Sequence, residues 1–321
     1  EQGLYLRIGN YDGNIGKEIT GLPNPNGKGA TGEIAYDLDG NILGTDEYGL
    51  DSEGIVAMKD GTFWISDEYG PHIVHYDADG KQIERISPFG IDTGKRHLPA
   101  VLARRRANRG MEGLAITPDE KTLVGIMQST LFNPSKKEIS NKQLVRIVTF
   151  DIKTGGTKQY AYIQNKETDS TCEITALSNT EFVVIERDGK FSGEKEAHKY
   201  LFKIDLKDAT DITGENPESK EGLLINGKTL EQCSTEEIEA AGIKPVKKEF
   251  LVDLVEYLPN KYPHDKLEGL WILDNSTIAV ANDNDFAINV ENNQLVQKKL
   301  PGTGRIDNDV IYVIKLPRSL R

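Results

Sequence analysis

Short apolar stretches, each bounded by turn-forming residues, recur along the chain. Residues 62–66, 122–126, 182–185 and 277–280 are almost continuously apolar and rich in β-branched and aromatic side chains. Such stretches are typical of strands that are covered on both faces. Another class of strand, at residues 145–150 for example, runs directly into a turn marked by Asp and Gly. The pattern predicts an all-β fold of antiparallel meanders.

One polar region carries a helical signal. Ser234 is a suitable N-terminal cap for a helix over residues 235–241, and Gly242 is a suitable C-terminal stop. The surrounding region, from about residue 208 to 248, is polar and irregular. We interpret it as an insertion that contains a short helix, within a single domain of residues 1–321.

A glutamate followed by a strand and then by a second polar residue occurs four times. The leading residues are Glu53, Glu112, Glu173 and Glu268. Self-similarity of this kind indicates repeated supersecondary units. Blades arranged radially bury both faces of every sheet and bring the innermost strands to one axis. The repeat therefore predicts a β-propeller, with the glutamates at its centre and residues 4–8 sharing a closing blade with residues 310–316.

Carboxylates that converge on one axis need a counter-charge. Ca²⁺ takes about 6–8 oxygen ligands, and the scarcity of Cys and His disfavours softer metals. We therefore expect Ca²⁺ as the cofactor. The expected ligands are Glu53, Glu112, Glu173, Glu268, Asp67 and Asp283. The alternative is that the glutamates pair with buried arginines, for which Arg109 and Arg187 are the candidates.

The overall charge narrows the choice of partners. The chain has 51 acidic and 39 basic side chains, and its formal net charge is −12. An acidic surface disfavours nucleic acids and anionic membranes. The chain also lacks an apolar run of about 18 residues that could span a bilayer. We expect a monomer that binds no nucleic acid and has no membrane span.

Several motifs resemble, in the same order, those of the bacterial family named for the esterase-like activity of phytase. They are DSEGI at 51–55, FWISDEYGP at 63–71, LPAVLA at 98–103, NRGMEGLA at 108–115, LEGL at 267–270 and NDNDF at 282–286. Glu173 departs from the pattern because Ile174, not Gly, follows it. Glu173 is therefore the least secure of the axial ligands.

The resemblance implies a six-bladed propeller that is secreted or periplasmic and hydrolyses an ester or phosphoester. A small anionic or ester substrate would then bind beside Ca²⁺. Asp67 or Glu68 would orient or deprotonate water, Arg187 would hold an anionic oxygen, and His72 would act as acid or base at the mouth. The alternative is a non-enzymatic binding or scaffold propeller in which Ca²⁺ or Glu–Arg pairs are structural.

Overall fold

The computed structural model describes residues 20–25, 32–37, 39–90, 94–258, 261–292 and 294–321. The expected strand at residues 4–8 lies outside these ranges. Strands dominate the described part, as the apolar pattern predicts. The helices are short: η1 (Ala100–Arg104), η2 (Leu230–Gln232), α1 (Thr235–Ala240), α2 (Leu254–Tyr257) and η3 (Asp285–Ala287). Within the described residues, none of them has the length and apolarity needed to cross a bilayer.

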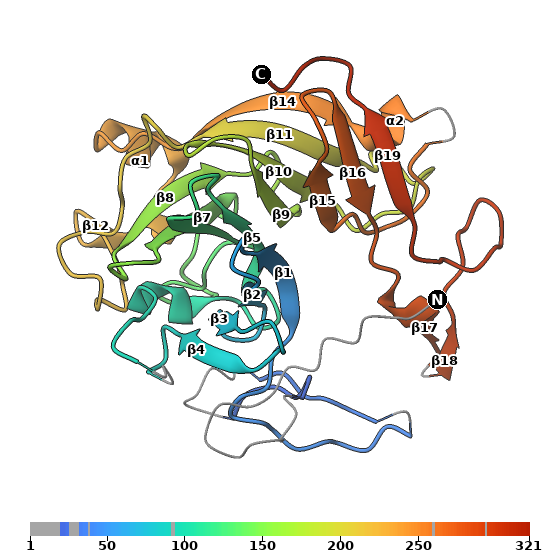
Figure 1. Ribbon diagram of the computed structural model, residues 1–321, viewed down its shortest axis with the longest axis horizontal. Coiled ribbons are helices and arrows are strands. Elements are labelled where there is room, and N and C mark those ends of the chain that lie inside the picture. Colours follow the sequence, from blue (N-terminus) through green and yellow to red (C-terminus); the bar gives the residue numbers. More distant parts are fainter. Residues whose placement is uncertain (1–19, 26–31, 38, 91–93, 259–260, 293) are drawn as a thin grey trace.

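Four antiparallel sheets form the body of the protein (Figure 1). The first contains β1 (Ser52–Ala57), β2 (Phe63–Asp67), β3 (Ile73–Tyr76) and β4 (Gln82–Ile86). The second contains β5 (Met111–Ile116), β6 (Thr122–Met127), β7 (Leu144–Asp151) and β8 (Thr157–Ile163). The third contains β9 (Ser170–Ala176), β10 (Glu181–Arg187), β11 (Lys199–Asp205) and β14 (Lys247–Asp253). The fourth contains β15 (Gly269–Ile272), β16 (Thr277–Ala281) and β19 (Ile311–Lys315).

The sheets are the blades of a β-propeller. Their first strands, β1, β5, β9 and β15, contact one another in that order and form the inner wall (Figure 1). The prediction of six blades is wrong, because the described residues form four. Each blade begins at one copy of the glutamate motif. The described residues that precede β1 add only an isolated bridge between Tyr36 and Ile42, not a further sheet.

Both faces of the inner blades are buried, as continuous apolar strands require. In β10, Phe182 and Val184 pack in the core shared with the first two blades. Val183 and Ile185, on the opposite face of the same strand, pack in the core shared with the fourth blade. Burying a side chain of this size contributes about 1.5–3 kcal/mol to the stability of the fold. The two faces of β10 therefore stabilise contacts with the blades on both sides.

The polar segment between β11 and β14 packs against the second blade. It contains the hairpin of β12 (Leu224–Ile225) and β13 (Lys228–Thr229), followed by η2 and α1. Ser234 caps α1 by accepting a hydrogen bond from the Glu237 backbone N–H at 3.2 Å, as the sequence predicts. Arg146 of β7 and Glu231 of η2 form a fully buried ion pair at 2.8 Å. A second hairpin, β17 (Ile288–Glu291) and β18 (Gln294–Gln297), lies between β16 and β19 in the sequence and forms a separate sheet.

Candidate functional site at the propeller axis

Irregular pairing at the start of the inner strands shapes the axial site. In β1, Glu53 and Gly54 together lie opposite Ser66 of β2. In β5, the register shifts between Met111 and Gly113, so Glu112 is the extra residue. A bulge of this kind re-aims a side chain that a regular ladder would hold in a fixed direction.

In the third blade, the extra residue is a cysteine. Strand β9 pairs Thr171 with Glu186 and Glu173 with Ile185, which leaves Cys172 at the bulge. Cys172 therefore corresponds to Glu112, whereas Glu173 corresponds to Gly113. In the fourth blade, Glu268 directly precedes Gly269 and corresponds to Glu112 in the same way.

The glycines that follow Glu53 and Glu112 are required by close packing. A Cβ atom on Gly113 would lie 2.7 Å from the backbone nitrogen of Ile174 and 2.8 Å from the Cα atom of Glu173. A Cβ atom on Gly54 would lie 2.5 Å from the backbone nitrogen of Leu114. Glycine has no Cβ atom, and it therefore allows the inner strands to approach one another this closely.

A second set of polar residues lies at the end of the second strand of each blade or directly after it. The set consists of Glu68, Gln128, Arg187 and Asp283. The backbone N–H of Glu68 donates to the carbonyl of Asp51 at 2.9 Å, and that of Gln128 donates to Gly110 at the same distance. These two residues therefore occupy equivalent positions in the first and second blades, and the two sets face the same end of the axis.

Two groups of potential ligand atoms result. Oxygen atoms of Asp51, Glu53 and Glu68 all lie within 4.8 Å of one another, and Glu68 is buried. Ligand atoms of Glu112, Cys172 and Glu268 form the other group and also lie within 4.8 Å of one another. Each trio is small enough to surround one ion.

Arginine balances part of this charge. The guanidinium of Arg187 forms a close ion pair with the carboxylate of Glu268. Arg109, the other candidate arginine, donates instead to the Ser170 hydroxyl at 2.7 Å. Glu112 is 3% exposed, and its Oε2 atom has no hydrogen-bond partner in the described part of the chain.

The remaining carboxyl groups have unfavourable surroundings for their charged forms. Burial and the neighbouring Glu112 raise the pKa of Glu53. Burial, Glu112 and Asp51 raise the pKa of Glu68 in the same way. The pKa of Glu112 is raised by burial and by Glu268. A cation placed among these groups would therefore be stabilised electrostatically.

Asp67 and His72 lie inside the first blade and not at the mouth. Both side chains are fully buried. Asp67 accepts hydrogen bonds from the backbone N–H groups of Asp51, at 2.8 Å, and Gly70. His72 Nε2 lies 3.1 Å from Asn24 Oδ1 and 3.7 Å from Asp67 Oδ2. Burial lowers the pKa of His72 well below its usual value and raises the pKa of Asp67 to about 7.

Glu173 lies further along the axis, beyond both groups. Its Oε1 atom accepts a hydrogen bond from the backbone N–H of Ile174 at 2.7 Å. The side chain lines an apolar cavity between the inner strands. Burial raises the pKa of Glu173 to about 8. The structure thus separates Glu173 from the other predicted ligands.

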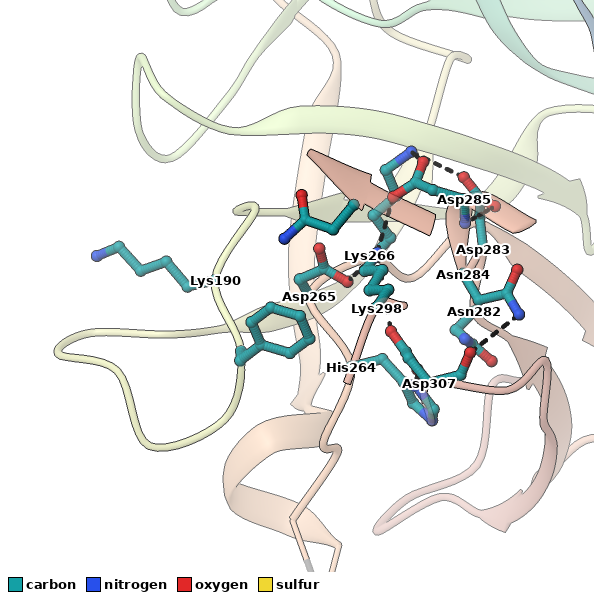
Figure 2. A network of polar contacts seen from close by, with 12 residues as sticks. Lys190, His264, Asp265, Lys266, Asn282, Asp283, Asn284, Asp285, Lys298 and Asp307 are labelled. Carbon is teal, nitrogen blue, oxygen red and sulfur yellow. Dashed lines mark hydrogen bonds and ion pairs between the residues drawn. The ribbon is translucent and has the colours of Figure 1, made fainter. Parts of the chain in front are cut away.

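Asp283 belongs to a network of alternating charges (Figure 2). Lys266 contacts Asp283 at 2.7 Å and Asp285 at 2.6 Å. Lys298 continues the network to Asp285 at 2.7 Å and to Asp265 at 2.9 Å. Asp283 already has a cationic partner, which distinguishes it from the trio of Asp51, Glu53 and Glu68.

Sequence reasoning missed Asp51 and Cys172. Asp51 and Glu53 are separated by one residue at the start of a strand, a spacing that places both side chains on one face. That spacing could have identified Asp51. Arg187 corresponds to Gln128 and Glu68 in the other blades. Aligning the motifs on these residues and counting back to the leading position would have identified Cys172.

The chain has a relative among described fungal proteins. A protein of the fungus Arthroderma benhamiae, described as an uncharacterized secreted protein, is 26% identical over 245 residues. The match covers 61% of this chain and 48% of the relative, so the chain spans about half the length of that protein. Because the relative is fungal, the match does not support a bacterial origin.

Among solved structures, the β-propeller domain of Cps50 (Swd1) from Myceliophteria thermophila is similar to this chain. The two share 12% identity with a TM-score of 0.26, over 81% of this chain and 86% of the other. The family described as phytase-like, with esterase-like activity of phytase, matches residues 14–286. This chain therefore belongs to the phytase-like family.

Proposed function

We propose that the protein is a secreted, Ca²⁺-dependent hydrolase of a small ester or phosphoester. The observation that carries the proposal is the convergence of Asp51, Glu53 and Glu68, whose ligand oxygens lie within 4.8 Å of one another. The family description, which names an esterase-like activity, supports the reaction class. The description of the fungal relative as secreted supports export.

The donor set fits a hard divalent cation. Asp51, Glu53 and Glu68 supply only carboxylate oxygens, the ligands that Ca²⁺ prefers. The unpartnered Oε2 atom of buried Glu112 adds an oxygen nearby. When bound there, the ion would supply Lewis-acid polarisation of a substrate oxygen.

The surrounding side chains have distinct tasks in this proposal. Arg187 offers a guanidinium that can hold a phosphate or carboxylate oxygen, although Glu268 is its partner at rest. Glu68 would contact the ion through one carboxylate oxygen and could accept a proton from water through the other. Asp67 acts as a positioning residue, since it holds the backbone of Asp51.

A non-enzymatic propeller is the second candidate. The close ion pair between Arg187 and Glu268 favours it, because this contact joins the third and fourth blades without a metal. His72 adds to it, since a fully buried imidazole cannot serve as an acid or base at the mouth. In this case, the axial charges would lock the blades and the loops would bind a partner.

Thermal unfolding of chelator-treated protein, with and without millimolar Ca²⁺, separates these candidates when it is combined with hydrolysis of p-nitrophenyl phosphate and p-nitrophenyl acetate. The variants are Glu53→Gln and Glu68→Gln, with exposed Glu256→Gln as the matched control. We expect Ca²⁺ to raise the Tm of the wild type and the control but not of the axial variants. A Ca²⁺-dependent Tm without hydrolysis would favour the scaffold, and no Tm change would refute the metal site.

A further inference from the structure

The inner strands enclose a cavity at the end of the axis opposite to the carboxylate groups. Its volume is about 700 Å³, and it is lined by residues from β1, β5, β9 and β15. The lining includes Ile55, Leu114, Ile174, Leu270 and Trp271. Binding sites for small organic molecules commonly have volumes of about 300–1,000 Å³ and mostly apolar walls.

The direction of the inner strands separates this cavity from the acidic site. Glu53 lies near the start of β1, whereas Ile55 to Ala57, which line the cavity, form its end. The same order holds in β15, where Glu268 precedes the strand and Trp271 lies within it. All four inner strands thus begin at the acidic mouth and end at the cavity.

The cavity opens to solvent at this second mouth. Trp271 is 69% exposed and Ile55 is 58% exposed, although both line the cavity. A large exposed aromatic ring beside an apolar recess is typical of a ligand site, because it offers contact area at a small entropy cost.

Glu173 is the polar group that gives the cavity its chemistry. Its Oε1 atom accepts the Ile174 backbone N–H, which orients the carboxyl group. Within the described ranges, no Lys, Arg or His side chain forms an ion pair with Glu173. The other charged residues of the lining are Asp274 and Arg321, and Arg321 donates to the carbonyl of Leu177. A carboxyl group without a counter-ion in an apolar recess complements a cationic head group.

We propose that this cavity binds a small amphipathic cation, whose apolar body contacts the inner strands and whose ammonium group pairs with Glu173. The site is independent of the hydrolase proposal, because it shares no side chain with the trio of Asp51, Glu53 and Glu68. An alkyl ammonium ion fits both parts of the site. Its chain replaces water next to Leu114 and Leu270, and its head group supplies the missing charge.

The two tryptophans provide the measurement. Trp64 is 1% exposed, whereas Trp271 lines the cavity, so a ligand in the cavity changes the emission of Trp271 alone. The full chain is titrated with octylamine, octanol and octanoate at pH 9, followed by fluorescence and by calorimetry. At this pH Glu173, whose pKa is about 8, is mostly ionised, and octylamine is still protonated. We expect saturable binding of octylamine, about tenfold tighter than octanol, with octanoate weakest.

Four variants complete the test. Glu173→Gln should abolish the preference for octylamine over octanol. Ala57→Phe should fill the mouth and remove binding of both, whereas Ile83→Ala, on an exposed site outside the cavity, should leave binding unchanged. Trp271→Phe should remove the fluorescence change while calorimetry still detects binding.

Two outcomes overturn the proposal. One is the absence of saturable octylamine binding to a folded full-length chain, including the case in which self-association covers the cavity. The other is octylamine binding that Ala57→Phe and Glu173→Gln leave unchanged, because the ligand would then lie elsewhere. Neither outcome bears on Ca²⁺ binding, which the Tm experiment with Glu53→Gln tests separately.

Discussion

Cys172 occupies in the third blade the bulge position that Glu112 occupies in the second. Its thiol lies within 4.8 Å of ligand atoms of Glu112 and Glu268. The axial ring therefore consists of three glutamates and one cysteine. This exchange removes one negative charge at the point where Arg187 binds Glu268.

Restoring the fourth carboxylate tests this correspondence. We expect Cys172→Glu to lower the Tm of chelated protein by several degrees, because another buried carboxylate would face Glu112 and Glu268. With Ca²⁺ in excess, the loss should shrink, since the added oxygen serves a cation. Thermal unfolding at several Ca²⁺ concentrations checks this, with Cys172→Ser as the control for loss of the thiol. An equal loss at every Ca²⁺ concentration would speak against a cation in this ring.

Removing one partner of the ion pair between Arg187 and Glu268 should destabilise the folded protein. We expect Arg187→Met to reduce the free energy of unfolding by about 3–5 kcal/mol, because the carboxylate loses its partner in a buried setting. The double variant Arg187→Met with Glu268→Met should recover much of this loss. Equilibrium denaturation in urea measures both. Additive losses in the double variant would mean that the two side chains do not interact.

The buried carboxyl groups predict an unusual dependence on pH. The pKa of Glu173 is raised to about 8 from its ordinary value near 4.5, so the folded state binds more protons than the unfolded state between these values. The stability of chelated protein should therefore fall as pH rises from about 4.5 to about 8. Glu173→Gln should flatten this slope. Tm values at pH 5, 6, 7 and 8 provide the test, and a stability that rises with pH in this range would contradict it.

Because the axis is closely packed, we expect the addition of one methyl group there to destabilise the folded protein. In Gly113→Ala, the new Cβ atom would meet the Ile174 backbone nitrogen at 2.7 Å. We expect a loss of about 1–3 kcal/mol, because backbone on both sides must shift. Gly302→Ala is the matched control, since its Cβ atom would have no neighbour within 4 Å. Similar urea midpoints for the two variants would show that the blades can separate at little cost.

Much of the fold follows from local patterns. The continuous apolar stretch at residues 182–185 predicts a strand buried on both faces, and β10 is such a strand. The Ser234 cap predicts α1, because the cap and its partner Glu237 are neighbours in sequence. Glycine after Glu53 and Glu112 predicts close packing at the axis. In each case, the chemistry that decides the structure lies within a few residues.

The remaining features depend on contacts between distant residues. The direction of the Asp67 side chain is decided by backbone N–H groups of Asp51 and Gly70, which no local pattern reveals. The bulge that selects Cys172 over Glu173 depends on pairing with β10. The number of blades depends on which segments form sheets, and the motif count of four was a better guide than the family resemblance.

The common direction of the four inner strands gives the two mouths different association kinetics. A cation approaching the mouth of Glu53, Glu68 and Glu112 is drawn by their negative field, so its association rate should fall steeply as salt screens that field. Entry at the mouth of Trp271 meets mostly apolar side chains, with few charged groups, so its rate should depend less on ionic strength. Salt concentration can therefore slow one end of the axis more than the other.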